Sequence, residues 1–548
     1  MLDAKAVATA LLLALAGLVL HRSLRSPSNR PPTFGSSLLP HFIRGILAVV
    51  RLGKDEDEFL TGLRRYGPVV KLPWPMSQYF VTDGDAIRKA YESPSRTLSF
   101  LPIRREMQGT AFGAGPFWSD PSIMDKQFFT THSKGMQKAN LGPTLERFVA
   151  YMRARIDELA SKVDSSPSGE ISVPLQAWVA ESFFKASTSA MFGDHVLDAS
   201  GTSKEELYRA FTAFDMSFPL EASGMVPPWL LARIPDVQAG RAAREVMART
   251  FEAWIRDGFD GLEQGVVRDM AQVALDNGLG TYEAGKMLVA DFWALQANAP
   301  FLAIQLLTYL LQAPPSLRSD LQAEFDASVS LASSSPETEA FTFSHLAQTL
   351  PLTQSCIVET LRLGTSTFSI RNVEQPLHFT STVANERTGK TQQKDVVIPP
   401  KTRLICATRV HHLDEKAWGS NAREWDGRRF YDGEVDGKEV GDEGERGAKS
   451  KRAREVYGFG GGISQCEGQY FAAAELKTFF ALLFSIFEVD CVSPLEQADA
   501  DQKYDRVKLY GVEKEGFMPK KIPNRIGMGA FQFRRDCEVQ LRLRRRKH

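Results

Sequence analysis

A glycine-rich segment that leads into one cysteine is the part of the sequence best suited to chemistry. It reads Phe459-Gly-Gly-Gly-Ile-Ser-Gln-Cys-Glu-Gly-Gln, and a run of strong helix formers follows at once. Glycine takes positive φ and lets the backbone approach a flat ligand, so Gly460–Gly462 and Gly468 leave room for a planar cofactor. A cysteine directly before a helix start is favoured as thiolate, the form that binds iron. We therefore predict that Cys466 is a metal ligand.

Two other interpretations of this loop are a turn with an incidental buried cysteine and a weak phosphate-binding loop. The loop contains neither GK[ST] nor G-x-G-x-x-G, which excludes the phosphate interpretation. The other cysteines are far apart and form no CxxC pair, so they indicate neither a disulfide framework nor a zinc ribbon. They are Cys356, Cys406, Cys491 and Cys537.

Four positions of the loop match a known family signature. Phe459, Gly462, Cys466 and Gly468 reproduce the pattern F-x-x-G-x-x-x-C-x-G, and the segment resembles the haem-binding loop of the cytochrome P-450 family. The resemblance implies that Cys466 is the axial ligand of haem b (iron protoporphyrin IX). It also implies that Phe459, Gly462 and Gly468 contact this cofactor.

Further upstream, the chain resembles the family at three arginine positions. Glu359-Thr-Leu-Arg362 resembles the E-x-x-R helix, and residues 425–430 resemble the segment that supplies a further arginine, Arg429. The resemblance implies a buried charge network of Glu359, Arg362 and Arg429, although a Glu and an Arg three positions apart are more often an exposed helix pair. Arg371 matches a position where the family often places a haem-propionate arginine.

The long helix expected across the distal haem face, at about Glu283 to Gln312, departs from the family pattern. Where members usually carry A-G-x-D/E-T, this chain has Ala294-Leu-Gln-Ala-Asn298-Ala-Pro300. Asn298 falls at the threonine position, and Pro300 should kink the helix. Three roles for Asn298 stay open: it could relay protons as a catalytic residue, it could orient an oxygenated substrate for rearrangement, or it could only cap the kink.

This Gln-Ala-Asn-x-Pro pattern resembles the subgroup of sterol 7α- and 12α-hydroxylases and prostacyclin synthase. Two further departures are Ser464, where a basic residue is usual, and the lack of a clear W-x-x-x-R. The resemblance implies a monooxygenase of secondary or lipid metabolism that hydroxylates a lipophilic sterol, terpenoid or polyketide-like substrate. Its electrons would come from NADPH through a partner cytochrome reductase.

Two other functions remain as alternatives to the monooxygenase. The first is a haem-thiolate isomerase or dehydratase that acts on an oxygenated substrate without a reductase. The second is a non-enzymatic haem sensor or carrier.

The elements that must position these residues are mainly helical. Apolar residues recur at three- and four-residue spacing from about Thr144 to Gln312, which predicts a helix-rich centre. Alternating β-branched and aromatic residues predict strands at 63–73, 78–83, 377–380, 396–405 and 538–543. Because strands flank the helices, we predict an α+β, mainly helical fold: one cytochrome P-450-type domain with small flanking β-sheets. Ser328–Thr338 and Asp432–Arg454 have the composition of solvated loops.

An unbroken apolar run from Ala6 to Leu20 begins the chain. No small-x-small cleavage site follows it, which favours an uncleaved anchor over a signal peptide. Basic residues are more numerous after the run than before it, so the body should face the cytosol from the endoplasmic reticulum membrane. We predict a transmembrane anchor over residues 1–22, a Pro-containing hinge over 23–34 and the haem-thiolate catalytic domain over 35–548.

The overall composition bounds the choice of partners. Lys+Arg and Asp+Glu both number 66 in 548 residues, so no basic field indicates nucleic acid as a partner. The expected partners are the reductase, membrane lipid and a lipophilic small molecule. Lys451, Arg452 and Arg454 precede the cysteine loop and could meet an acidic reductase surface, or they could be a solvated charged loop.

Overall fold

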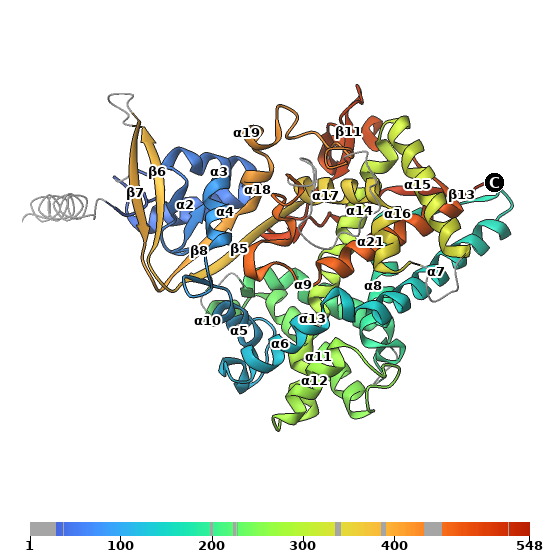
Figure 1. Cartoon of the computed structure of the whole chain (residues 1–548), viewed down its shortest axis with the longest axis horizontal. Helices are drawn as coiled ribbons and strands as arrows, with labels where there is room; N and C mark the ends of the chain where they lie inside the picture. Colours follow the sequence, from blue (N-terminus) through green and yellow to red (C-terminus); the bar gives the residue numbers. More distant parts are fainter. Residues whose placement is uncertain are drawn as a thin grey trace, which may run out of the picture. The chain divides into compact units, whose positions relative to one another are not determined.

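A computed structural model shows the chain as two compact units, each described by itself (Figure 1). The described residues are 29–36, 38–197, 201–222, 226, 228–334, 341–384, 391–431, 452–523 and 525–547. The smaller unit takes the described residues up to Ile103 and those of Phe368–His411. The larger unit takes those of Arg104–Thr367 and of His412–His548. The predicted anchor, residues 1–22, and most of the predicted hinge lie outside the described residues.

The smaller unit combines helices with a small sheet. The helices are α2 (His41–Lys54), α3 (Glu56–Leu63), α4 (Gly84–Glu92) and α18 (Thr408–His412), whose last residue belongs to the larger unit. The sheet has the order β1 (Val69–Lys71), β2 (Tyr79–Val81), β8 (Thr402–Ala407), β5 (Thr365–Val373), and β3 (Leu98–Ser99) also pairs with β5. A hairpin joins β6 (Leu377–Ala384) to β7 (Thr391–Ile398). The predicted strand pair is confirmed as β1 and β2, but residues 63–66 are helical and that part of the prediction is wrong.

The larger unit is mainly helical. Its long helices are α5 (Leu101–Thr110), α7 (Gly142–Ser165), α8 (Leu175–Phe192), α9 (Lys204–Ala222), α11 (Pro235–Arg256), α12 (Val266–Asp276), α13 (Thr281–Gln296), α14 (Ala299–Gln312), α15 (Pro315–Ser334), α17 (Pro351–Gly364) and α21 (Gln469–Ile486). The first three residues of α5 belong to the smaller unit. Its shorter helices are α6 (Phe129–Gly135), α10 (Pro228–Leu231), α16 (Phe343–Thr349), α19 (Glu415–Trp418) and α22 (Ala500–Lys503). The mainly helical α+β prediction is confirmed.

Small sheets complete the larger unit. One has the order β4 (Glu170–Pro174), β13 (Gln540–Arg545), β9 (Phe487–Cys491), and another pairs β10 (Tyr504–Val507) with β11 (Gly516–Pro519). A short strand, β12 (Met528–Ala530), lies antiparallel to Thr365–Thr367, the first residues of β5. This pairing brings a late segment of the chain beside the end of α17.

The core of the larger unit lies around α14 and α21. Both helices are apolar on almost every face, which is typical of helices surrounded by protein. α14 packs against α8, α17 and α21. Among the described residues, only the Thr281–Gln312 run is long and apolar enough to cross a membrane, and 61% of its most apolar window is buried inside the structure. This run is the core helix pair α13 and α14.

One predicted loop is partly wrong. Residues 328–334 continue α15 instead of forming a solvated loop. Ser328 is buried, and its hydroxyl lies 3.1 Å from Nε2 of His345 and 2.9 Å from Oγ1 of Thr349. These partners on the neighbouring helix explain how a serine-rich stretch can stay helical.

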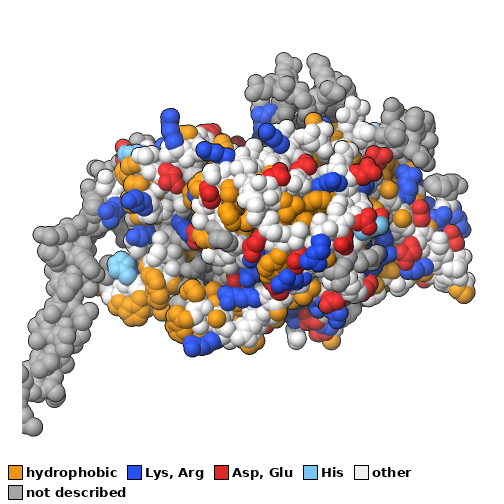
Figure 2. Space-filling model, turned by 90° about the horizontal axis from the view of Figure 1, so that it is seen from below, with side chains coloured by type: hydrophobic (Ala, Val, Ile, Leu, Met, Phe, Trp, Pro, Cys, Tyr) orange, Lys and Arg blue, Asp and Glu red, His pale blue; other side chains and the backbone are white. Residues whose placement is uncertain are grey.

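The surface carries both signs of charge. Figure 2 shows Lys and Arg side chains intermingled with Asp and Glu over the face that it draws. This agrees with the equal numbers of basic and acidic residues in the sequence.

Candidate functional site

Cys466 lies in a tight loop immediately before α21. Its amide donates a 2.9 Å hydrogen bond to the carbonyl of Phe459, which closes the loop. Gly460 and Gly462 have φ of 72° and 67°, the left-handed region that favours glycine. The loop therefore needs these glycines for its own backbone, and Phe459 packs partly buried against the core.

The side chain of Cys466 is accessible although the surrounding protein is dense. It is exposed, yet desolvation raises the pKa of its thiol, while hydrogen bonds from the Gly468 and Gln469 amides oppose this rise. The amides at the helix start therefore stabilise the thiolate as predicted, but desolvation has the larger effect on the pKa of the free thiol. Binding of a metal would release the proton.

The residues around Cys466 provide one thiol and leave the position of Gly468 uncrowded. A Cβ added at Gly468 would meet Met136 Cε at 3.6 Å and Cys466 Sγ at 3.8 Å, which is ordinary contact, so no described protein atom requires glycine there. Among the described residues, no group of three or more His, Cys, Asp or Glu is placed to hold a metal ion. A single thiolate therefore suits a metal whose other ligands come from the cofactor itself, as in haem.

An ion cluster that the sequence did not predict surrounds the residue after the cysteine. Glu467 Oε2 lies 3.0 Å from Arg104 Nη2 and 2.5 Å from His132 Nδ1, and the Ser133 hydroxyl also donates to this carboxylate. His132 Nε2 lies 3.2 Å from Oδ1 of Asp291 on α13.

The cluster fixes the charge of Glu467. Although desolvation opposes it, the hydrogen bond from His132 and the charge of Arg104 lower the pKa of Glu467 to about 2. The cluster thus ties the cysteine loop to three helices: α5, α6 and α13. The only sign of this ion cluster in the sequence was the acid Glu467 beside Cys466, and one acid does not reveal which distant residues pair with it.

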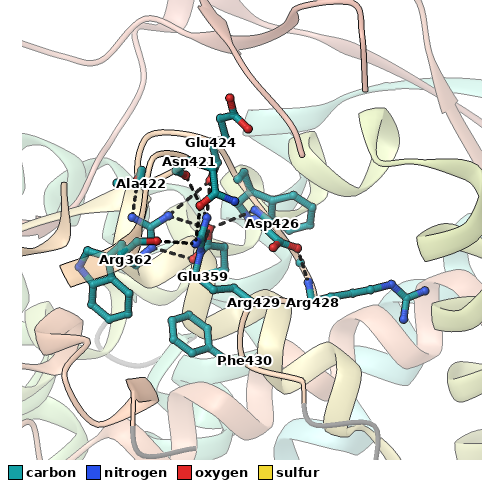
Figure 3. A network of polar contacts seen from close by, with 12 residues as sticks. Glu359, Arg362, Asn421, Ala422, Glu424, Asp426, Arg428, Arg429 and Phe430 are labelled. Carbon is teal, nitrogen blue, oxygen red and sulfur yellow. Dashed lines mark hydrogen bonds and ion pairs between the residues drawn. The ribbon is translucent and has the colours of Figure 1, made fainter. Parts of the chain in front are cut away.

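The structure brings Glu359, Arg362 and Arg429 together in a buried network (Figure 3). Both oxygens of Glu359 accept from Arg362, at 2.7 Å each, and Oε1 also accepts from Arg429 Nε at 3.0 Å. The side chains of Glu359 and Arg362 are 0% exposed. The interpretation of Glu359 and Arg362 as an exposed helix pair is therefore wrong.

Every remaining donor of the two guanidinium groups also has a partner. Arg362 donates to the carbonyls of His412, Ala422 and Glu424. Arg429 donates to the carbonyls of Trp418, Asn421 and Glu424 and to the side chain of Asn421. The network fixes the segment around residues 412–430 to α17 and satisfies its own buried charges.

The predicted long helix is interrupted just before Pro300. α13 ends at Gln296, and α14 begins at Ala299 with Pro300 in its first turn. A proline lacks the amide that would continue the hydrogen bonds of α13, which explains the break. Asn298 occupies the N-cap position of α14, but its side chain makes no capping bond.

The side chain of Asn298 contacts β12 instead. Its Oδ1 accepts a 2.9 Å hydrogen bond from the amide of Ala530, and a Cβ at Gly529 would lie 2.2 Å from this oxygen. Asn298 is half-buried, and Ala294, one turn earlier on the same face, is exposed although α13 is largely a core helix. This face of α13 therefore keeps an accessible strip that ends at Asn298.

Arg371 lies on β5 in the smaller unit. It is buried, its Nη1 donates to the carbonyl of Ile370 at 2.8 Å, and burial lowers its pKa. Its guanidinium lies 5.5 Å from the ring centre of Phe100 and 5.9 Å from that of Tyr91. A role of Arg371 at the haem propionates stays a prediction.

The predicted basic patch is only partly described. Lys451 lies outside the described residues, and Arg452 and Arg454 are exposed. Arg452 donates to the carbonyl of Ala417 at 2.7 Å, so it is held against the segment before the network. Contact with a reductase stays a prediction.

Comparisons with known proteins agree with the cysteine loop and its surroundings. The profile of the family described as Cytochrome P450 matches residues 36–509. The chain is 27% identical over 348 residues to a cholesterol 7-alpha-monooxygenase of Cricetulus griseus, a match that covers 59% of this chain and 64% of that protein.

Two further relatives match over most of both chains. A 7-alpha-hydroxycholest-4-en-3-one 12-alpha-hydroxylase of Homo sapiens is 22% identical over 511 residues, which cover 89% of each chain. A sterol 14-alpha demethylase of Pyrenophora dematioidea is 23% identical over 487 residues, 85% of this chain and 82% of that protein. The predicted likeness to sterol 7α- and 12α-hydroxylases is confirmed, and the chain belongs to the cytochrome P450 family of haem-thiolate oxidoreductases.

Proposed function

We propose that this chain is a membrane-anchored monooxygenase that hydroxylates a lipophilic, sterol-like substrate at a haem held by Cys466. The observation that carries the proposal is an accessible cysteine in a glycine loop at the start of α21, in a structure whose described residues contain no group of three or more His, Cys, Asp or Glu placed to hold a metal ion. The names of the relatives, which act on sterols, support this substrate class.

Each site residue has a separate task in the proposed enzyme. Cys466 supplies the thiolate, and a thiolate-bound haem supplies oxygen activation because the sulfur donates electron density that favours O–O cleavage. Gly462, Gly468 and Phe459 would contact haem b beside the thiolate, and Arg371 would supply a positive charge for a propionate. Glu359, Arg362 and Arg429 hold the segment before the loop.

In the proposed enzyme, Asn298 would support proton delivery at the accessible strip of α13. Its Oδ1 is fixed by the Ala530 amide, so its amide group has one orientation relative to β12. A fixed amide can position an ordered water, and Asn298 would in this way hold a proton donor at the accessible strip.

The proposed enzyme receives electrons from NADPH through a partner reductase and works at the endoplasmic reticulum membrane. Apart from the anchor, α2 supports contact with lipid, since Phe42, Ile46 and Val50 are exposed on one side of this amphipathic helix. Arg51 and Lys54 at its end suit anionic headgroups.

The first test of the proposal is the spectrum of the reduced protein with carbon monoxide. Wild type should show the red-shifted Soret band of a thiolate-bound haem, and Cys466→Ser should lose it. Cys491→Ser, a half-buried cysteine on β9, is the control and should keep the band. Retention of the band in Cys466→Ser would refute the ligand assignment.

The second test separates a proton-relay role of Asn298 from a structural role. Asn298→Ala should continue to consume NADPH while more of the electrons appear as peroxide, because proton delivery is impaired. Gln305→Ala is the matched control, since the buried Gln305 also ties the same helix to this segment, through a 3.1 Å bond to the Phe531 carbonyl. Equal peroxide yields in the two variants would show that Asn298 is only structural.

The alternative is a haem-thiolate isomerase or dehydratase. It is favoured by one observation: Asn298 stands where an alcohol is usual, and no acid precedes it. Turnover of an oxygenated substrate without NADPH and reductase would establish this alternative, and strict dependence on both would exclude it.

A further inference from the structure

A second buried charge pair lies in the larger unit, away from the network of Glu359. Arg525, in the loop before β12, places Nη1 3.0 Å from Oδ2 of Asp215 on α9. The same nitrogen donates to the Asp215 carbonyl at 2.9 Å. Both side chains are almost fully buried, at 5% and 4% exposed.

The two partners differ in how well their polar atoms are satisfied. The carboxylate of Asp215 also accepts from Trp293 Nε1 and from Gln532 Nε2, each at 2.8 Å. The Nε and Nη2 atoms of Arg525, by contrast, are buried and have no hydrogen-bond partner among the described residues. A buried charged group with unmade hydrogen bonds is costly, so an acceptor from outside the chain is expected.

The unpaired atoms form a recognisable binding edge. Nε and Nη2 lie on one side of the planar guanidinium, and their N–H groups point in parallel. This edge matches the two oxygens of a carboxylate, which it can bind through two charge-assisted hydrogen bonds. A single water cannot accept both bonds in this geometry as well as a carboxylate can.

An aromatic wall adjoins the charge pair. The ring of Trp293, whose indole N–H binds Asp215, lies 4.1 Å from that of Phe218 and 5.7 Å from that of Phe112. Phe112 and Phe218 are themselves 5.2 Å apart. The combination of a cationic edge with a flat apolar wall suits an amphipathic molecule.

The pair is also linked to the accessible strip of α13. Trp293 directly precedes the exposed Ala294. Arg525 and Gln532 flank β12, whose Ala530 amide binds Asn298. A molecule held at Arg525 would therefore contact the same segment that binds Asn298, the residue to which we assign proton delivery.

We propose that Arg525 binds the carboxylate of an acidic lipophilic substrate through Nε and Nη2, with the apolar skeleton against Trp293 and Phe218. This inference rests on the proposed function and narrows its substrate class from neutral lipids to lipophilic carboxylic acids. Because both nitrogens are shielded in the free chain, neighbouring side chains must move when the acid enters.

The experiment compares cholanic acid, a steroid carboxylic acid, with its methyl ester as probes for the haem-loaded full chain near neutral pH. Isothermal titration calorimetry should show that wild type binds the acid about tenfold or more tightly than the ester. Arg525→Gln should bind both probes equally. Arg525→Lys, which keeps the charge without the planar edge, should retain only a small part of the preference.

Two controls keep the result interpretable. Arg534→Gln removes an exposed arginine near β12 and should leave the preference unchanged. If Arg525→Gln does not fold, the double variant Asp215→Asn/Arg525→Gln removes both charges and should lose the preference in a folded protein.

Two outcomes would overturn the inference without touching the proposed function. Equal affinity for acid and ester in a wild-type protein with a normal thiolate Soret band would show that Arg525 binds only water or is purely structural. A preference that survives in Arg525→Gln would place carboxylate recognition elsewhere. Loss of the Soret band in wild type, by contrast, would refute the proposed function itself.

Discussion

Two buried charge clusters of the larger unit differ in how completely their hydrogen bonds are satisfied. In the network of Glu359, Arg362 and Arg429, both arginines donate from every nitrogen of their guanidinium groups. In the pair of Arg525 and Asp215, the carboxylate is satisfied, but two guanidinium nitrogens have no partner among the described residues. Within the part of the chain that the structure describes, the first cluster is complete and the second is not.

The difference indicates different tasks. A complete network fixes the backbone around it, because each partner would be stranded if another were removed. An incomplete pair keeps hydrogen-bonding capacity that a ligand can use. Buried charge alone therefore does not identify a functional site, whereas unpaired donors on a buried charge require a partner beyond the described residues, such as a water or a ligand.

Removal of Arg362 should have the largest effect. Arg362→Gln would leave Glu359 buried with one charged partner and would remove the guanidinium donor from the carbonyls of His412 and Ala422, and we expect a loss of about 3–5 kcal/mol in the free energy of unfolding. Chemical denaturation followed by circular dichroism measures this loss, and haem content after purification should fall with it.

Arg428 provides the matched control for Arg362. It neighbours Arg429 in Figure 3 but pairs with Asp320 at the surface, where both side chains are partly exposed. Arg428→Gln should cost less than about 1 kcal/mol. A similar loss in both variants would contradict a special role for the complete network.

The next effect concerns Glu475, a buried carboxyl with a single partner. Ser187 donates to it at 2.5 Å, and desolvation raises its pKa from 4.5 to about 8. Between these values the folded protein holds a proton that the unfolded chain releases, so stability should fall as the pH rises through this window, by at most about 1.4 kcal/mol per pH unit.

Glu475→Gln should remove this pH dependence, because glutamine imitates the protonated acid. Thermal melts at several pH values measure the effect, with the exposed Glu488→Gln on β9 as the control. An unchanged slope in Glu475→Gln would mean that Glu475 is charged and that burial without pairing is tolerated here.

The smaller loss of the two clusters belongs to Arg525. In Arg525→Gln, Asp215 loses its charged partner but keeps its bonds from Trp293 and Gln532, so we expect a loss of about 3 kcal/mol in the free energy of unfolding, the low end of the range for a broken buried pair. Denaturation alongside Arg362→Gln compares the two clusters directly. A loss for Arg525→Gln as large as that for Arg362→Gln would remove the distinction between a complete and an incomplete cluster.

Much of this architecture could be predicted because it depends on local patterns. Helical periodicity predicted the helix-rich centre, and Pro300 predicted the interruption between α13 and α14. The loop predicted at Ser328–Thr338 was wrong for residues 328–334, because His345 and Thr349 on the next helix give Ser328 its partners.

The residues of the candidate site also differ in whether the sequence alone reveals that they belong together. Cys466 and its glycines form one continuous segment, so the sequence reveals them together. The ion cluster of Glu467 joins Arg104, His132 and Asp291 from three separate helices, and the pair of Arg525 and Asp215 joins residues 310 positions apart. Such contacts are set by tertiary packing and leave no periodic signal.

The sheet of β4, β13 and β9 has a consequence for how the protein is made. β13 lies between the other two strands, and its Arg544 binds Glu170, 374 positions earlier. During translation, β4 has no strand partner until the ribosome has passed residue 545. Contacts of such high contact order form slowly and leave strand edges open to aggregation. Yield in a foreign host should therefore depend on chaperone supply more than on the intrinsic stability of the helices.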